Sequence, residues 1–138
     1  MAMALVVTLE KELPEAEAAY RKADSGKALF RELEKIDFAA RCKNVQQPSS
    51  LLSESVAKLA EQMRADGFDP AKMRLPAEQW FAASEGLKVV RALMEYVSAN
   101  LNNFKQPNPI LKGLRAVEAL LVAADSAGAR FHFTKMEA

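Results

Sequence analysis

Apolar residues recur at spacings of three and four through one long stretch of the chain. The series is Trp80, Ala83, Leu87, Val90, Met94, Val97 and Leu101. Residues three and four apart lie on the same face of an α-helix, so this spacing predicts a helix with a continuous apolar stripe. We expect the helix to begin at Pro76, because proline suits the first helical position, and to end near Leu101. The interior Gly86 predicts close packing against a neighbouring element.

Three further segments have helical spacing, and residues 15–23 form a shorter, alanine-rich candidate. The apolar stripes are Leu29, Leu33, Ile36 and Ala40, then Leu52, Val56, Leu59 and Met63, and finally Ile110, Leu114, Val117, Leu121 and Ala124. Residues 24–26 either separate two helices or kink one helix that spans 14–42. Gly67 and Gly128 are typical of the left-handed residue that follows a helix.

Capping residues predict where two of these helices begin. The candidate N-caps for the second stripe are Ser49, Ser50 and Ser53. Asn108 as the cap and Pro109 as the first helical residue predict the start of the last helix.

Both ends of the chain alternate with a period of two, which is typical of a β-strand. The alternation covers residues 3–11 and 129–134. A lone strand leaves its backbone groups unpaired, so we expect the two ends to form an antiparallel ribbon. The inner face would carry Leu5, Val7, Leu9, Phe131 and Phe133. The outer face would carry Thr8, Glu10, Arg130, His132 and Thr134.

These elements predict a mostly α fold, with four or five helices in a bundle and a two-stranded ribbon of the chain ends. An all-α bundle is the alternative if the ribbon does not form. No linker rich in Gly, Ser or Pro divides the chain, so residues 1–138 are expected to form a single domain. The ribbon would leave two open edges, which favour association of two copies, as an exposed apolar helix face also would.

The charge balance excludes some classes of partner. There are 19 Lys and Arg against 18 Asp and Glu, and no basic run. The sequence therefore gives no support for nucleic-acid binding. The apolar start lacks a basic flank and is too short to span a bilayer, so no membrane partner is expected. The single cysteine, Cys42, favours a reducing compartment, and we expect a cytoplasmic protein.

No set of residues in the sequence points to a known chemistry. One histidine and one cysteine are too few for a zinc site, and no glycine-rich phosphate loop is present, so no metal or cofactor is expected. Cys42 is expected to be a small buried packing residue. His132 is expected to be a half-exposed strand residue. Glu32 with Lys35, and Arg91 with Glu95, have the spacing of surface ion pairs on a helix.

The leading hypothesis is therefore a non-enzymatic protein-binding module of the adaptor or inhibitor type, with another protein or a second copy as its partner. Trp80 and Phe81 are the candidate interaction residues, because aromatic anchors are enriched at interfaces. The alternative is an enzyme or small-ligand-binding protein whose pocket is lined by Glu10, Arg130 and His132. We predict no catalytic residue, and the sequence leaves enzymatic activity open. A pocket holding His132 beside an acid would favour the alternative. An exposed apolar patch with Trp80 or Phe81 would favour the module.

Overall fold

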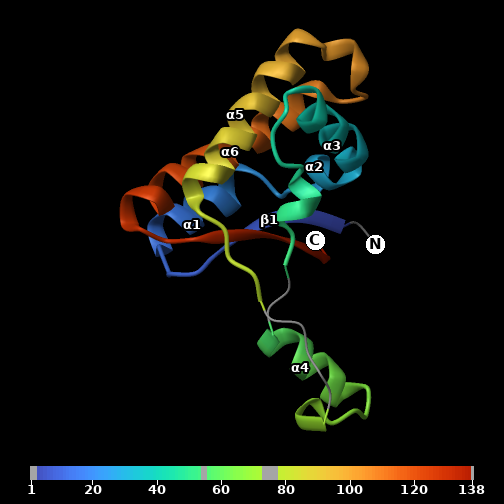
Figure 1. Cartoon of the computed structure of the whole chain (residues 1–138), viewed down its shortest axis with the longest axis vertical. Helices are drawn as coiled ribbons and strands as arrows, with labels where there is room; N and C mark the ends of the chain where they lie inside the picture. Colours follow the sequence, from blue (N-terminus) through green and yellow to red (C-terminus); the bar gives the residue numbers. More distant parts are fainter. Residues whose placement is uncertain (1–2, 54–55, 73–77, 138) are drawn as a thin grey trace.

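The structure is a computed structural model that describes residues 3–53, 56–72 and 78–137 of the chain. It is mostly α, with a two-stranded antiparallel sheet made by the two chain ends, as the sequence predicts (Figure 1). The elements are β1 (Met3–Leu9), α1 (Pro14–Ala23), α2 (Lys27–Arg31), α3 (Leu33–Cys42), the 3₁₀ turn η1 (Pro48–Leu51), α4 (Val56–Ala65), the 3₁₀ turn η2 (Pro70–Lys72), α5 (Ala83–Ala99), the 3₁₀ turn η3 (Leu101–Asn103), α6 (Pro107–Ala127) and β2 (Phe131–Glu137).

The ribbon is antiparallel and has the predicted inner face. Leu9 lies opposite Phe131, and Val7 lies opposite Phe133. These four side chains and Leu5 are all buried, with Phe131 fully inaccessible. A two-stranded ribbon is marginal in water unless one face is covered, and here the helices cover it.

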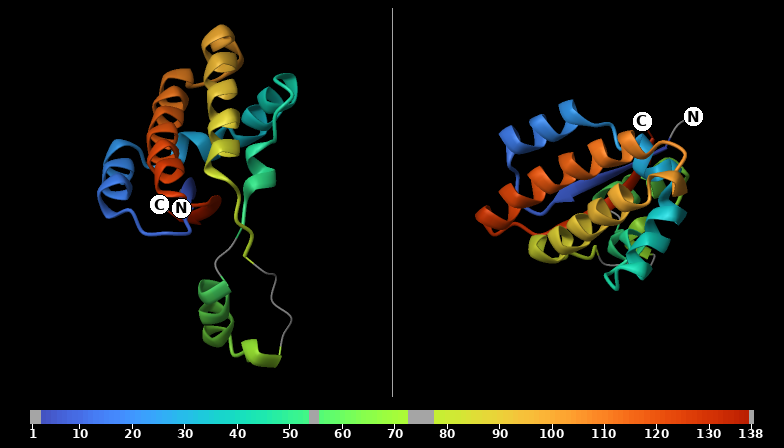
Figure 2. Two further views of the ribbon diagram at one scale, coloured as in Figure 1. Left: turned by 60° about the vertical axis from the view of Figure 1, so that its left-hand side comes forward. Right: turned by 90° about the horizontal axis from the view of Figure 1, so that it is seen from above.

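The helices other than α4 form a layer over the inner face of the ribbon (Figure 2). The long helices α5 and α6 pack side by side, α1 lies against α6, and α3 lies against α5. Among the helices of the described residues, none is both long enough and apolar enough to cross a membrane.

At Gly86, α5 lies very close to the ribbon. A β-carbon at this position would lie 2.5 Å from Cζ of Phe131 and 2.8 Å from Cδ1 of Leu121. Real side chains do not approach so closely, so the helix needs glycine at this point. The sequence-based prediction of close packing is confirmed.

The long central helix starts later than predicted. α5 begins at Ala83, so Trp80 and Phe81 precede it, and the predicted start at Pro76 lies outside the described residues. Phe81 exchanges two backbone hydrogen bonds with Phe131 (2.8 and 2.9 Å), which requires an extended backbone at Phe81. At the other end, Leu101 lies in η3 with 46% of its surface exposed. The predicted stripe is therefore wrong at both ends.

The segment 14–42 contains more than one helix. A break at residues 24–26 separates α1 from α2, where Gly26 takes a left-handed φ of 81°. A second break at Glu32 divides the predicted 27–42 helix into α2 and α3. Cys42, at the end of α3, is exposed, so its predicted burial is wrong.

Some predicted helix starts are also wrong. Ser49 and Ser50 lie within η1. The Oγ of Ser53 accepts a hydrogen bond from the backbone of Gln79 (2.8 Å), and residues 54–55 lie outside the described residues, so Ser53 as the cap of α4 stays a prediction. Leu52 pairs with Phe133 as a β-bridge, and so is not part of a helical stripe. The last helix begins at Pro107, with Gln106 in place of Asn108 as its N-cap.

The predicted helix ends are confirmed. Gly67 and Gly128 have left-handed φ values of 87° and 69°. At the end of α4, the N–H of Phe68 donates to the carbonyl of Met63 (2.8 Å), which is the bond expected when glycine follows the helix.

The ribbon edges are less open than the sequence suggested. On β1, the N–H of Leu5 donates to the carbonyl of Gly26, and the N–H of Val7 donates to the hydroxyl of Tyr20. On β2, the outward backbone groups of Phe131 bond to Phe81, and the carbonyl of Phe133 accepts from Ser53. A second copy therefore finds few free backbone groups at these positions, which weakens the sheet-edge route to a dimer.

Tyr20 gives a pH-dependent prediction for the stability of the fold. Burial raises the pKa of Tyr20 to about 12, although the hydrogen bond from Val7 lowers it in part. The neutral phenol therefore stabilises the folded state fully below pH 10, and this stabilisation is lost as the pH rises from 10 towards 12. Two pKa units correspond to about 2–3 kcal/mol. Chemical unfolding of the wild type and of Tyr20→Phe at several alkaline pH values measures how this contribution to the free energy of unfolding changes with pH. The stability advantage of the wild type should shrink over this window, and a constant difference would contradict the assignment.

Residues 56–72 form an arm that projects away from the rest of the molecule. Figure 1 shows α4 on the side of the ribbon opposite α5 and α6. Within the described residues, the main packing partner of α4 is η2, which belongs to the same arm. The chain enters and leaves the arm at one place, where Ser53 is bonded to Gln79.

Candidate functional site

His132 lies on the outer face of the ribbon, as predicted, but it is fully buried. The ring of Trp80 covers it, with 4.7 Å between the ring centroids. Its Nε2 lies 2.6 Å from a carboxylate oxygen of Glu78. The prediction of a half-exposed strand residue is therefore wrong. The physical reason is that residues 78–80, which return from the arm, cross over the imidazole.

The imidazole also belongs to a chain of hydrogen bonds along the outer face. Nδ1 lies 3.1 Å from the carbonyl oxygen of Phe133 and 3.2 Å from the hydroxyl of Thr134. The hydroxyl of Thr134 is in turn 2.7 Å from that of Thr8. These hydrogen bonds connect Glu78, on the segment that returns from the arm, to both strands of the ribbon.

The other two predicted ligand-binding residues pair with each other. Nε of Arg130 donates to both carboxylate oxygens of Glu10 (3.1 Å each) in an exposed ion pair. The hydrogen bond from Arg130 lowers the pKa of Glu10, and Glu10 raises that of Arg130. This pair lies just beyond the Leu9–Phe131 end of the ribbon. Trp80 and Glu78 cover His132, so the three residues do not line a common pocket.

Trp80 and Phe81, the predicted interaction residues, are both partly buried against the ribbon. Trp80 covers His132, and the Phe81 ring packs at a tilt on Phe131, with 6.4 Å between centroids. Their apolar surface is largely used within the chain. Among the described residues, the exposed aromatic side chains are instead Phe38 and Phe68.

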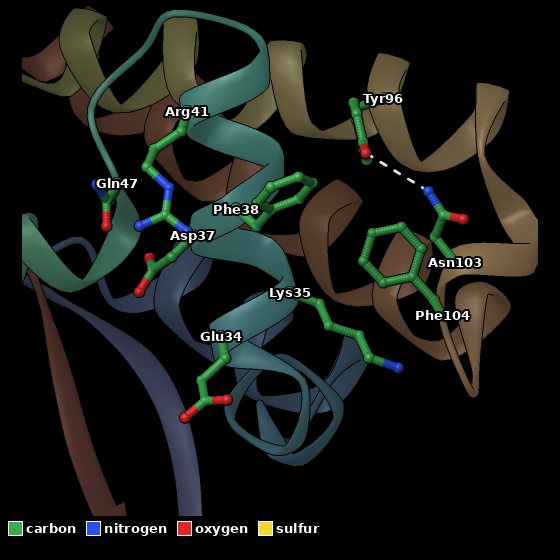
Figure 3. Close-up of a pocket in the computed structure, with 9 residues that line it drawn as sticks. All are labelled: Glu34, Lys35, Asp37, Phe38, Arg41, Gln47, Tyr96, Asn103 and Phe104. Atoms are coloured by element: carbon green, nitrogen blue, oxygen red, sulfur yellow. Dashed lines mark hydrogen bonds between the residues drawn. The ribbon is translucent and has the colours of Figure 1, made fainter.

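An open groove of about 590 Å³ lies between α3 and the segment formed by α5 and η3 (Figure 3). Phe38 projects from α3 into this space, with 52% of its surface exposed. The facing wall carries Tyr96 and Phe104. Their rings pack edge to face, at an interplanar angle of 87° and with centroids 6.3 Å apart. Nδ2 of Asn103 donates to the hydroxyl of Tyr96 at 3.5 Å. We call this surface the Phe38 groove.

The charged residues around the Phe38 groove differ in how far they are already paired. Lys35 contacts the carboxylate of Glu32 (3.5 Å), and Asp37 accepts from the backbone of Ser49 (3.2 Å). The guanidinium of Arg41 lies 5.7 Å from the centre of the Phe38 ring. Arg41 forms no ion pair with another described residue. Its positive charge is therefore available to a carboxylate that enters the groove, which the carboxylates of Glu34 and Asp37 also line.

Sequence reasoning missed this groove. Phe38 falls between the stripe positions Ile36 and Ala40, and Tyr96 falls beside Val97, so neither belongs to a predicted apolar stripe. An exposed aromatic off the stripe was the available signal. The two helices that carry these residues are brought together only by the packing of α3 on α5.

Comparisons of the chain with protein-family models, with curated proteins and with solved structures gave no match. Within the described residues, no three side chains of His, Cys, Asp or Glu gather as a metal site. The function must therefore be argued from the geometry.

Proposed function

We propose that this protein is a non-enzymatic protein-binding module whose receptor surface is the Phe38 groove. The observation that carries the proposal is the half-exposed ring of Phe38 beside Arg41. Aromatic residues and arginine are the residue types most enriched at the centres of protein interfaces. A partner that covered this ring would remove apolar surface from water, which favours binding.

The ligand that we propose is a peptide segment with an aromatic side chain next to a carboxylate. The aromatic ring would pack on Phe38 and Tyr96, since offset or edge-on ring pairs are favourable. The carboxylate would accept hydrogen bonds from Arg41, whose planar guanidinium suits a two-oxygen acceptor.

Peptide binding tests this proposal directly. A short fluorescein-labelled Gly-Ser peptide with one phenylalanine between two aspartates should bind in a fluorescence anisotropy titration. A peptide with lysines in place of the aspartates should bind more weakly. Phe38→Ser should reduce the affinity by about tenfold or more, as loss of an aromatic anchor does at other interfaces. Arg41→Glu should remove the preference for the acidic peptide.

Val122→Ser is the matched control for these variants. Val122 is an exposed apolar residue (44%) on α6, and it does not line the Phe38 groove. This variant should bind the acidic peptide with the wild-type affinity. Equal binding by the wild type and Phe38→Ser would reject the groove as the receptor surface.

The second candidate function is an enzyme or small-ligand site near His132, and one observation favours it. A hydroxyl (Thr134), an imidazole (His132) and a carboxylate (Glu78) follow one another at 3.2 and 2.6 Å, which is the order of an activated nucleophile, its base and the group that orients the base. A fluorophosphonate probe tests it. Labelling of Thr134 that His132→Asn abolishes would favour an enzyme, and an unlabelled wild type would count against it.

A further inference from the structure

The chain contains one histidine and one tryptophan, and the fold brings their rings into contact. Trp80 belongs to residues 78–81, which come back from the arm and cross the outer face of the ribbon. We call these residues the return segment. Glu78, at its start, lies 2.6 Å from Nε2 of His132. Phe81, at its end, exchanges backbone hydrogen bonds with β2. The return segment is therefore held to the ribbon at both of its ends.

Both nitrogens of the His132 ring face oxygens that only accept hydrogen bonds. Nε2 faces the carboxylate of Glu78, and Nδ1 faces the carbonyl oxygen of Phe133 at 3.1 Å. A neutral imidazole has a single N–H, so in either tautomer one ring lone pair would point at such an oxygen. The hydroxyl of Thr134 can donate to a bare Nδ1, but the carbonyl would still face the same lone pair. The doubly protonated ring, in contrast, donates on both sides.

Glu78 supplies the negative charge that balances a protonated His132. The charged residues nearest to the imidazole along the two strands are Glu10 and Arg130, and these pair with each other. Residues 51–53, which bond to β2 beside the ring, carry no charged side chain. The imidazole itself is buried, but the Glu78 side chain is partly exposed, so a proton can pass between the ring and the solvent.

We propose that Glu78 and His132 form a pH-dependent latch that holds the return segment on the ribbon. While the ring is doubly protonated, Nε2–H donates to the Glu78 carboxylate in a charge-assisted hydrogen bond, and the Trp80 ring lies within reach of the positive charge. When the ring loses a proton, the ion pair is lost and one ring nitrogen faces an oxygen to which it cannot donate. Histidine changes charge between about pH 5 and 8. The latch is therefore closed at the acid end of this range and loosens towards the alkaline end.

The latch does not depend on the Phe38 groove, because neither of its residues lines that groove. It does restrict the second candidate function. A doubly protonated His132 cannot take a proton from Thr134, so an enzyme of that kind would work only in the alkaline form of the latch. Loosening of the return segment also exposes Trp80 and the imidazole. One proton thus controls how well the outer face of the ribbon is covered.

The fluorescence of Trp80 tests the first step, which is protonation of the ring. An imidazolium in contact with an excited indole quenches its emission more strongly than a neutral imidazole does. The emission of the full-length wild type should therefore rise in a single step between about pH 5 and 8. Because the chain has one tryptophan and one histidine, this step belongs to the Trp80–His132 pair. His132→Asn should show no step.

Hydrogen exchange followed by NMR tests the second step, which is the loosening of the return segment. Protection factors remove the intrinsic effect of pH on exchange. Across the same pH range they should fall by about tenfold at the amides of Gln79 and Phe81, the order expected when a charge-assisted hydrogen bond is replaced by a neutral one. The amide of Leu5, which bonds to Gly26 on the other edge of the ribbon, is the internal control and should keep its protection.

Glu78→Gln and Glu10→Gln form a matched pair of variants, since each replaces one carboxylate by an amide. In Glu78→Gln the fall in protection should disappear, whereas Glu10→Gln should keep it, because Glu10 pairs with Arg130. Circular dichroism of both variants shows whether the helices are kept. Three results would each overturn the inference: emission that does not change with pH, a return segment whose protection is constant or falls only as that of Leu5 does, or a fall that persists in Glu78→Gln.

Discussion

Phe131→Ala is expected to lower the free energy of unfolding by about 3–5 kcal/mol, the usual cost of removing a fully buried phenylalanine. Phe131 is 0% exposed and lies where β2, Phe81 and α5 meet. Its ring also packs edge-on against Phe133 (centroids 5.5 Å apart). Truncation leaves a cavity that these neighbours cannot close without breaking the backbone pairing with Phe81. Equilibrium unfolding in guanidinium chloride, followed by circular dichroism, measures the change.

The same ring determines the effect of a change at Gly86. In the wild type, Gly86→Ala should destabilise the protein by about 1–3 kcal/mol, because its new methyl group would meet Phe131 at 2.5 Å. In the Phe131→Ala background the methyl group enters the cavity, and alanine favours a helix over glycine by about 1 kcal/mol. The substitution should then cost less than in the wild type, because the contact with the Phe131 ring is gone and that with Cδ1 of Leu121 (2.8 Å) remains. An equal loss of stability in both backgrounds would show that the ring is not what excludes a β-carbon.

The ribbon and its inner face could be predicted because their signal is local. Alternation with a period of two marks each strand, and the two terminal segments were the strands the sequence offered. The helix ends at Gly67 and Gly128 were predictable for the same reason, since a left-handed residue is a property of the chain at that point. Such features do not depend on which distant segment packs nearby.

The burial of His132 beneath Trp80 and Glu78 could not be predicted, and neither could the late start of α5. Both depend on contacts between residues that are distant in the sequence. Glu78 reaches His132 across 54 positions, and Phe81 is held extended by Phe131. The helical spacing that included Trp80 was present in the sequence but was overridden by this pairing. The surface ion pair predicted between Arg91 and Glu95 was wrong for a related reason.

Arg91 bonds instead to Glu118 on α6 (3.1 Å), and Glu95 bonds to Lys43 (3.1 Å). Spacing within one helix shows which residues can meet. A neighbouring helix can nevertheless bring another acid to Arg91, or another base to Glu95, and these partners compete with the pair within the helix. The candidate site follows the same rule. Phe38 and Tyr96 face each other only after α3 has packed on α5, so no local pattern marks the groove.

Glu32→Ala is expected to destabilise the fold by roughly 1–3 kcal/mol for each backbone N–H that it leaves unpaired. Its sequence spacing suggested a surface ion pair with Lys35, and that contact does form at 3.5 Å. Glu32 is nevertheless 5% exposed, and its two carboxylate oxygens accept from the backbones of Lys105 (2.7 Å) and Gln106 (3.2 Å). Gln106 is the N-cap of α6, so the carboxylate closes the start of that helix from a distant segment, where a negative charge is also favourable.

Lys35→Ala is the matched control, because it removes the ion pair and keeps the two backbone hydrogen bonds. Lys35 is well exposed, so its loss should change the free energy of unfolding by less than about 1 kcal/mol. Glu32→Gln should fall between the two variants, since its amide keeps one acceptor oxygen for the two N–H groups. Hydrogen exchange should be faster at Lys105 and Gln106 in Glu32→Ala and unchanged in Lys35→Ala. Equal losses of stability in the two alanine variants would instead assign the role of Glu32 to the ion pair.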